Sequence, residues 1–195
     1  MSFRHEVAVS GGAAVRPSAA MRVVRVAIGA MVVSAAAQVA VPLPFTPVPV
    51  TLQPLAVLAV GGLLGATEGL GALLLYLALG LLGLPVFFAG GAGIGHLLGP
   101  TGGYLLAFPI AAAATGAIAA PAGRPSRAVW RVLAGCVTGM LLIHAGGIAQ
   151  LALVTGDAGS AFRMGFVPFF TGDLIKIGLA AAVILLGASR VRPAA

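Results

Sequence analysis

Residues 101–120 read TGGYLLAFPIAAAATGAIAA and contain no charged side chain. A helix needs about 20 mainly apolar residues to span the hydrocarbon core of a bilayer, so this stretch is long enough to cross once. The composition of the chain agrees, since 60% of its 195 residues are hydrophobic and 8% are charged. A soluble domain carries roughly a quarter charged residues because its surface faces water. The stretch and the composition therefore predict a protein whose surface faces mainly lipid.

Similar apolar runs recur along the chain and predict an all-α membrane protein with six transmembrane helices. A β-barrel would instead show short strands of alternating polarity. The 29 glycines fit close packing between membrane helices. The second and third runs are short, and Glu68, in the turn between them, is expected to be solvated. The predicted helices cover residues 23–41, 52–66, 69–84, 101–120, 130–153 and 169–188.

The arginines predict the orientation of these helices. With the N-terminus in the cytoplasm, nine arginines lie on the cytoplasmic side and only Arg163 lies outside, as the positive-inside rule requires. This predicts a multi-pass protein of the cytoplasmic (inner) cell membrane with both termini in the cytoplasm. Because the arginines gather on one predicted side of the membrane, the net charge of +7 does not indicate a nucleic-acid partner. The cytoplasmic arginines are Arg4, Arg16, Arg22, Arg25, Arg124, Arg127, Arg131, Arg190 and Arg192.

The chain is predicted to be a flexible N-terminal tail, residues 1–20, followed by a substrate-binding membrane domain, residues 21–195. The alternative is that residues 22–41 form a cleaved signal peptide, because Arg22 and Arg25 precede an apolar run. That run is long for a signal core. Its removal would also leave five helices and spoil the charge asymmetry.

The segments predicted to lie outside, residues 42–50, 85–100 and 155–168, are rich in proline, glycine and phenylalanine. Proline stiffens a loop, and glycine, as at Gly90 and Gly91, lets the backbone approach a ligand closely. Phe45, Phe87 and Phe88 could cover the apolar part of such a ligand. These loops are therefore predicted to form a rim or lid over a binding site.

Polar side chains from several predicted helices fall in the outward half of the membrane and indicate a shared pocket. Asp173 and Lys176 are the strongest candidates, because a charge in the membrane costs roughly 2.5–3.5 kcal/mol and usually pairs or serves function. Their i, i+3 spacing places them on one helix face, where lysine would attract a carboxylate and aspartate would accept from N–H groups. The alternative is an ion pair without a ligand. The polar set is Gln38, Gln53, Tyr104, Gln150, Asp173 and Lys176, with Tyr76 and His144 somewhat deeper.

Other chemistries find little support in the sequence. His144 is expected to be a hydrogen-bonded packing residue, and the three histidines lack metal-ligand spacing, so neither a metal nor a cofactor is expected. The glycines of residues 90–95 are not followed by Gly-Lys-Ser/Thr, so nucleotide binding is not expected. The pair Ala30 and Ser34 gives a small-xxx-small pattern, which could pack internally or dock a partner.

Four motifs together resemble the BioY family, the biotin-specific S components of energy-coupling factor transporters. They are PFTPVPVTLQ at 44–53, GLPVF at 83–87, LGPTGGY at 98–104 and GDLIK at 172–176. The resemblance covers nearly the whole chain apart from about 20 N-terminal residues. It implies a six-helix membrane subunit whose binding site opens on the extracytoplasmic side.

The resemblance also implies a function and partners. Biotin would be the ligand, Asp173 and Lys176 would contact it, and the first outer loop would help close the site. A transmembrane T component and ABC-type ATPase subunits would be the partners, within membrane lipid, and Ala30 with Ser34 would correspond to the docking signature. The alternatives are an S component for another small vitamin, an intramembrane enzyme using Asp173 and Lys176 as acid and base, and a structural protein.

Overall fold

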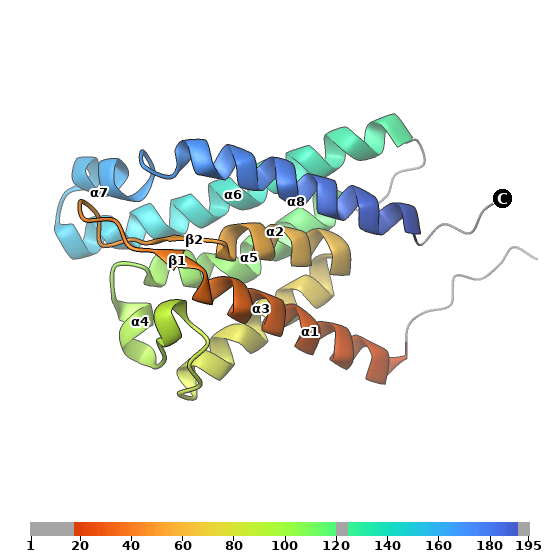
Figure 1. The fold of residues 1–195 in the computed structure, drawn as a ribbon, viewed down its shortest axis with the longest axis horizontal. Coiled ribbons are helices and arrows are strands. Elements are labelled where there is room, and N and C mark those ends of the chain that lie inside the picture. Colours follow the sequence, from red (N-terminus) through yellow and green to blue (C-terminus); the bar gives the residue numbers. More distant parts are fainter. Residues whose placement is uncertain (1–17, 120–124, 191–195) are drawn as a thin grey trace, which may run out of the picture.

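The computed structural model describes residues 18–119 and 125–190 as a bundle of helices with one short strand pair (Figure 1). Most of the predicted tail lies outside these residues, as do Arg4, Arg16, Arg124 and Arg192. The elements are α1 (Ala19–Gln38), β1 (Ala40–Val41), β2 (Val50–Thr51), α2 (Gln53–Leu64), α3 (Ala66–Leu81), the 3-10 turn η1 (Phe88–Gly90), α4 (Ile94–Leu98), α5 (Gly102–Ala119), α6 (Pro125–Thr155), α7 (Ala158–Gly165) and α8 (Phe170–Arg190).

The prediction of a mainly helical membrane protein is confirmed. Four helices, α1, α5, α6 and α8, are long and apolar enough to cross a membrane. The other two predicted spans are shorter. At a rise of about 1.5 Å per residue, the 12 residues of α2 and the 16 of α3 extend about 18 and 24 Å, against about 30 Å of hydrocarbon.

The outer segments are more ordered than the sequence predicted. The first is closed by antiparallel pairing of β1 with β2, the second contains η1 and α4, and the third contains α7. Asp157 caps α7 by accepting from the backbone N–H groups of Gly159 and Ser160. Hydrogen bonds from Ser160, with a smaller contribution from Gly159, hold the pKa of Asp157 below its usual range. These elements were missed because each is too short to show a hydrophobic period.

Helices α2, α3 and α5 pack through glycines. Gly65, at a φ of 83°, makes the turn from α2 to α3, a conformation that other residues rarely adopt. A Cβ added to Gly61 would lie 2.7 Å from the Cα of Ala112 and overlap its carbonyl oxygen. The backbones of α2 and α5 therefore touch directly, as small residues permit in membrane bundles.

Glu68 is not solvated, and that prediction was wrong. Its side chain is 11% exposed, with carboxylate oxygens 3.6 Å from Nε of Arg22 and 3.2 Å from Nε of Arg25. A half-buried carboxylate needs such partners to offset its lost hydration. The contacts tie the start of α1 to the start of α3.

The two ends of the bundle differ. The first turn of α1 and the last turns of α8 lie at one end, whereas α4, α7 and the β1–β2 pair lie at the other (Figure 1). The predicted outer segments therefore gather at one end, opposite the described ends of the chain. The candidate site lies beneath them.

Candidate functional site

The start of α2 places a buried amide beside a buried phenol. Thr51 ends β2, and its hydroxyl accepts from the backbone N–H of Gln53, which begins the helix. The Nε2 of Gln53 donates to the hydroxyl oxygen of Tyr76 on α3 at 2.7 Å. Both side chains are buried, with Tyr76 at 0% exposed. The pair is therefore held in one geometry by backbone and side chain together.

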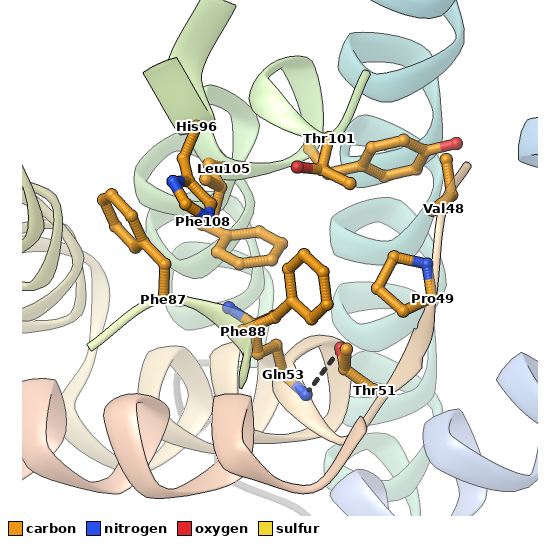
Figure 2. A pocket seen from close by; sticks show the side chains of 11 residues that line it. Val48, Pro49, Thr51, Gln53, Phe87, Phe88, His96, Thr101, Leu105 and Phe108 are labelled. Carbon is orange, nitrogen blue, oxygen red and sulfur yellow. Dashed lines mark hydrogen bonds between the residues drawn. The ribbon is translucent and has the colours of Figure 1, made fainter. Parts of the chain in front are cut away.

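A cavity lies beside Gln53 (Figure 2). Its mostly apolar lining with a few polar groups is typical of small-ligand sites. Its lining residues come mainly from four places: the segment before α2, the turn η1, and the helices α4 and α5. The lining residues are Val48, Pro49, Thr51, Gln53, Phe87, Phe88, His96, Thr101, Tyr104, Leu105 and Phe108.

The predicted loop residues Phe87 and Gly90 are held over the bundle by α1. The Nε2 of Gln38, the last residue of α1, donates to the carbonyl of Phe87, and its Oε1 accepts from the N–H of Gly90. The Phe87 ring is fully buried and meets Tyr76 edge-on at 5.5 Å between centroids. Gly80 leaves the space that this ring fills, since a Cβ there would overlap it.

Gly91 and His96 shape the other side of the same loop. A Cβ at Gly91 would collide with the imidazole of His96, so glycine lets the ring lie against the backbone. The Nδ1 of His96 contacts the carbonyl of Ala92 at 3.1 Å. His96 also lies 5.6 Å from the Phe87 ring, and both line the cavity. The sequence predicted that Gly91 lets the backbone approach a ligand, whereas in this structure the space beside it holds the His96 ring of the same chain.

Tyr104 is fixed at the opposite wall of the cavity. Its hydroxyl donates to the carbonyl of Gly165 at 2.7 Å, and its ring covers Gly147, where a Cβ would overlap it. The ring then meets His144 of α6 edge-on at 6.2 Å between centroids. Tyr104 therefore joins the cavity to the charged residues of α8.

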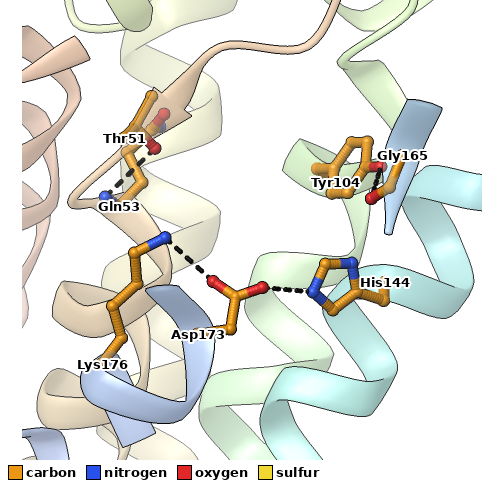
Figure 3. A network of polar contacts seen from close by, with 7 residues as sticks. All are labelled: Thr51, Gln53, Tyr104, His144, Gly165, Asp173 and Lys176. Carbon is orange, nitrogen blue, oxygen red and sulfur yellow. Dashed lines mark hydrogen bonds and ion pairs between the residues drawn. The ribbon is translucent and has the colours of Figure 1, made fainter. Parts of the chain in front are cut away.

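Those charged residues form a row of three buried side chains (Figure 3). Lys176 Nζ donates to Asp173 Oδ1 at 2.9 Å, and His144 Nε2 lies 2.6 Å from Asp173 Oδ2. All three are 5–7% exposed. Asp173 and Lys176 share one helix face, as their i, i+3 spacing predicted, and they form an ion pair. The expectation that His144 is hydrogen-bonded is also confirmed, and its partner is the carboxylate.

This row keeps unused hydrogen-bonding capacity. A carboxylate offers about four lone-pair sites and an ammonium group three protons. Asp173 uses one contact at each oxygen and Lys176 one proton, among the contacts of the described residues. Further acceptor sites and N–H donors therefore remain for a ligand that carries both kinds of group.

A second cavity opens between α6 and α8. His144 and Asp173 lie in its lining, which is otherwise apolar. The contact between Tyr104 and His144 therefore connects the linings of the two cavities. The lining residues are Val137, Met140, Leu141, His144, Phe166, Phe170, Asp173, Leu174 and Ile177.

Three residues singled out in the sequence lie elsewhere. Phe45 is 63% exposed and does not line the described cavities. Ala30 is 0% exposed within the core of the bundle, so its methyl group is not available to a docking partner. Ser34 is partly exposed, and its hydroxyl donates to the carbonyl of Ala30. Of the two residues in the small-xxx-small pattern, Ala30 therefore packs inside the bundle.

The sequence reasoning missed several lining residues. Thr101 belongs to the quoted motif LGPTGGY, which was a usable signal. Phe108 lies one turn further along α5, in register with Tyr104, so the helical period was a second signal. No pattern in the sequence indicated that His96 faces Phe87.

The hydrogen bond from Gln53 to Tyr76 gives a direct prediction. Replacing Tyr76 with Phe leaves the buried Nε2 of Gln53 without this acceptor, which typically costs about 1–3 kcal/mol. We expect Tyr76→Phe to lower the thermal stability of the detergent-purified protein. Size-exclusion recovery after heating measures it. Unchanged stability of Tyr76→Phe would contradict the described contact.

Fold and site together define a class: a multi-pass helical membrane protein with a small-ligand cavity at one end, beside a buried ion pair. The model of the BioY family matches residues 8–193. The chain belongs to the BioY family.

Several relatives agree with this assignment. A probable biotin transporter BioY of Pyrococcus horikoshii is 41% identical over 71% of this chain and 78% of its own length. A biotin transporter BioY of Thermotoga maritima is 40% identical over 73% and 82%. The biotin transporter BioY2 of Lactococcus lactis is 36% identical over 86% and 88%.

A solved structure supports the fold. It is described as the S-component for biotin from an ECF-type ABC transporter, and it matches with a TM-score of 0.77 at 24% identity. The match covers 91% of this chain and 96% of that one. At this identity the likeness establishes the architecture, and the ligand is a separate question.

Proposed function

We propose that this protein is the biotin-binding membrane subunit of a biotin uptake system. The observation that carries the proposal is the connected arrangement of an apolar cavity, the Tyr104–His144 contact and the buried Asp173–Lys176 pair. Relatives covering most of the chain are named biotin transporters. These names favour transport over the alternative of an intramembrane enzyme.

The chemistry of biotin fits the residues present. Biotin has a flat ureido group, an apolar sulfur-containing ring and a flexible chain ending in a carboxylate. Phe88 supplies aromatic surface for the ring, and the buried Phe87 lies behind it in the lining. Gln53, Tyr104 and Asp173 offer hydrogen-bonding groups for the ureido function. Lys176 supplies the positive charge that the carboxylate requires, and its remaining protons can donate to it.

We propose that α1, α2, α3, α5, α6 and α8 all cross the membrane, with both termini in the cytoplasm. Arg22 and Arg25, at the start of α1, contact Glu68 in the first turn of α3, which supports placing these segments on one membrane side. The arginine asymmetry supports placing that side in the cytoplasm of the cell. The cavity and its loops then face the extracytoplasmic side, from which biotin arrives.

We propose a transmembrane T component and ABC-type ATPase subunits as protein partners, with membrane lipid around the helices. The structural neighbour is described as part of an ECF-type ABC transporter. The outward face of α1 presents Ile28, Met31 and Ala35, and α1 has its buried face against α2 and α3. None of the described residues covers that face, so lipid or a membrane partner can contact it.

Uptake measurements test the proposal. The chain is expressed in bacteria that lack their own biotin importer, with and without an ECF module, and uptake of labelled biotin is followed. We expect saturable uptake with the module that unlabelled biotin suppresses and that riboflavin or thiamine leaves unchanged. Uptake of another vitamin in place of biotin would reject the ligand while keeping the transporter class.

A further inference from the structure

A third buried residue stands beside the proposed ligand-binding pair. The carboxylate of Asp173 is held from two sides, by Lys176 on its own helix and by His144 on α6. Lys176 is a flexible four-carbon chain and cannot by itself fix the plane of a carboxylate. The imidazole is rigid and reaches Asp173 from a different helix.

The imidazole is itself held by two aromatic rings. Tyr104 meets it at 6.2 Å and 82°, and Phe166 at 5.0 Å and 76°. Tyr104 is in turn anchored to Gly165 by its hydroxyl. His144 is 6% exposed, so solvent does not compete for its ring nitrogens. The direction from which His144 approaches Asp173 is thus set by the fold.

The ring nitrogens indicate what His144 does. Nε2 faces a carboxylate and therefore carries the proton, so the hydrogen bond to Oδ2 is charge-assisted. Nδ1 is buried and has no hydrogen-bond partner among the described residues. Packing alone would be served equally by an apolar side chain, which leaves no polar atom unpaired. The contact that an apolar side chain could not make is the hydrogen bond to Asp173.

We infer that His144 is a positioning residue for the ligand: it holds Oδ2 so that the carboxylate of Asp173 cannot turn both oxygens onto Lys176. Without it the pair would close on itself and use the protons of Lys176 that a ligand carboxylate needs. The carboxylate oxygens of Asp173 would also no longer be held in one orientation. This inference rests on the proposed function, since it concerns the same biotin site.

Two amide variants separate the nitrogens of the ring. The side-chain N–H of Gln reaches the position of Nε2, whereas that of Asn reaches only the position of Nδ1. We expect His144→Gln to bind biotin within about threefold of the wild type. His144→Asn and His144→Leu should bind about ten- to hundredfold more weakly, the range for losing a hydrogen bond to a buried charge. Equilibrium dialysis of tritiated biotin against detergent-purified protein gives the dissociation constants.

A double-mutant cycle tests the route through Asp173. If His144 acts on the ligand only by holding that carboxylate, His144→Leu should add little to the loss already caused by Asp173→Asn. Additive losses would overturn the inference. Equal affinities of the Gln and Asn variants would do so too, as would variants that differ in folded yield but bind equally once folded. Failure of the well-folded wild type to bind biotin would instead reject the proposed function.

Discussion

Lys176→Met is expected to weaken biotin binding about thirtyfold or more. Methionine keeps the unbranched shape but removes the charge proposed to meet the ligand carboxylate. Truncating one member of a buried, hydrogen-bonded charge pair typically costs about 2–5 kcal/mol. The variant also leaves Asp173 without one of its two partners, so its stability in detergent should fall. Dissociation constants from equilibrium dialysis and recovery after heating measure the two effects.

A double variant separates binding from stability. Asp173→Asn combined with Lys176→Met removes both charges, so no buried charge remains unpaired at this position, and stability should recover toward that of the wild type. Binding should remain lost. If Lys176→Met alone folds normally and binds biotin as tightly as the wild type, Lys176 has no part in ligand recognition and the ion pair only supports α8.

Gly61→Ala is expected to abolish correct folding or to destabilise the bundle by about 3 kcal/mol. The new methyl group would lie 2.7 Å from the Cα of Ala112 and overlap the carbonyl of that residue. Backbone atoms of a packed helix cannot move aside as the end of a side chain can, and overpacking costs typically 1–3 kcal/mol, sometimes more. Because α5 also carries Tyr104 and Phe108, any folded protein should bind ligand poorly.

Gly178→Ala is the matched control on α8. A Cβ at Gly178 meets no atom within 4 Å, and the residue lies within a helix. Alanine favours a helix over glycine by roughly 0.5–1 kcal/mol, so stability should be unchanged or slightly higher. Monodisperse yield and thermal recovery of the two variants compare them directly. Equal behaviour would contradict the close approach of α2 to α5.

The sequence predicted what depends on local composition and spacing. Apolar runs located α1, α2, α3, α5, α6 and α8 to within a few residues at most of their ends, and the i, i+3 spacing placed Asp173 and Lys176 on one helix face. Both rest on periodicities that a single segment contains. The predicted depth of the polar side chains in the membrane placed Gln53 and Tyr104 in one pocket, and the cavity lining includes both.

Contacts between distant segments were not predictable in this way. The partner of His144 lies 29 residues away on another helix, and the loop that Gln38 holds lies about 50 residues away. Glu68 was predicted to be solvated because it lies in the turn between two apolar runs. The arginines that contact it come from α1. Which face of a membrane helix turns inward is decided by packing with its neighbours, so Ala30 and Phe45 could not be placed from their motifs.

The most direct test of the proposed function is equilibrium binding of tritiated biotin to the detergent-purified wild-type chain. Saturable binding near one biotin per chain, displaced by unlabelled biotin and unaffected by riboflavin, is the result that we predict. A monodisperse, thermally stable preparation that shows no saturable biotin binding would contradict the assignment of the cavity and of the Asp173–Lys176 pair to this ligand.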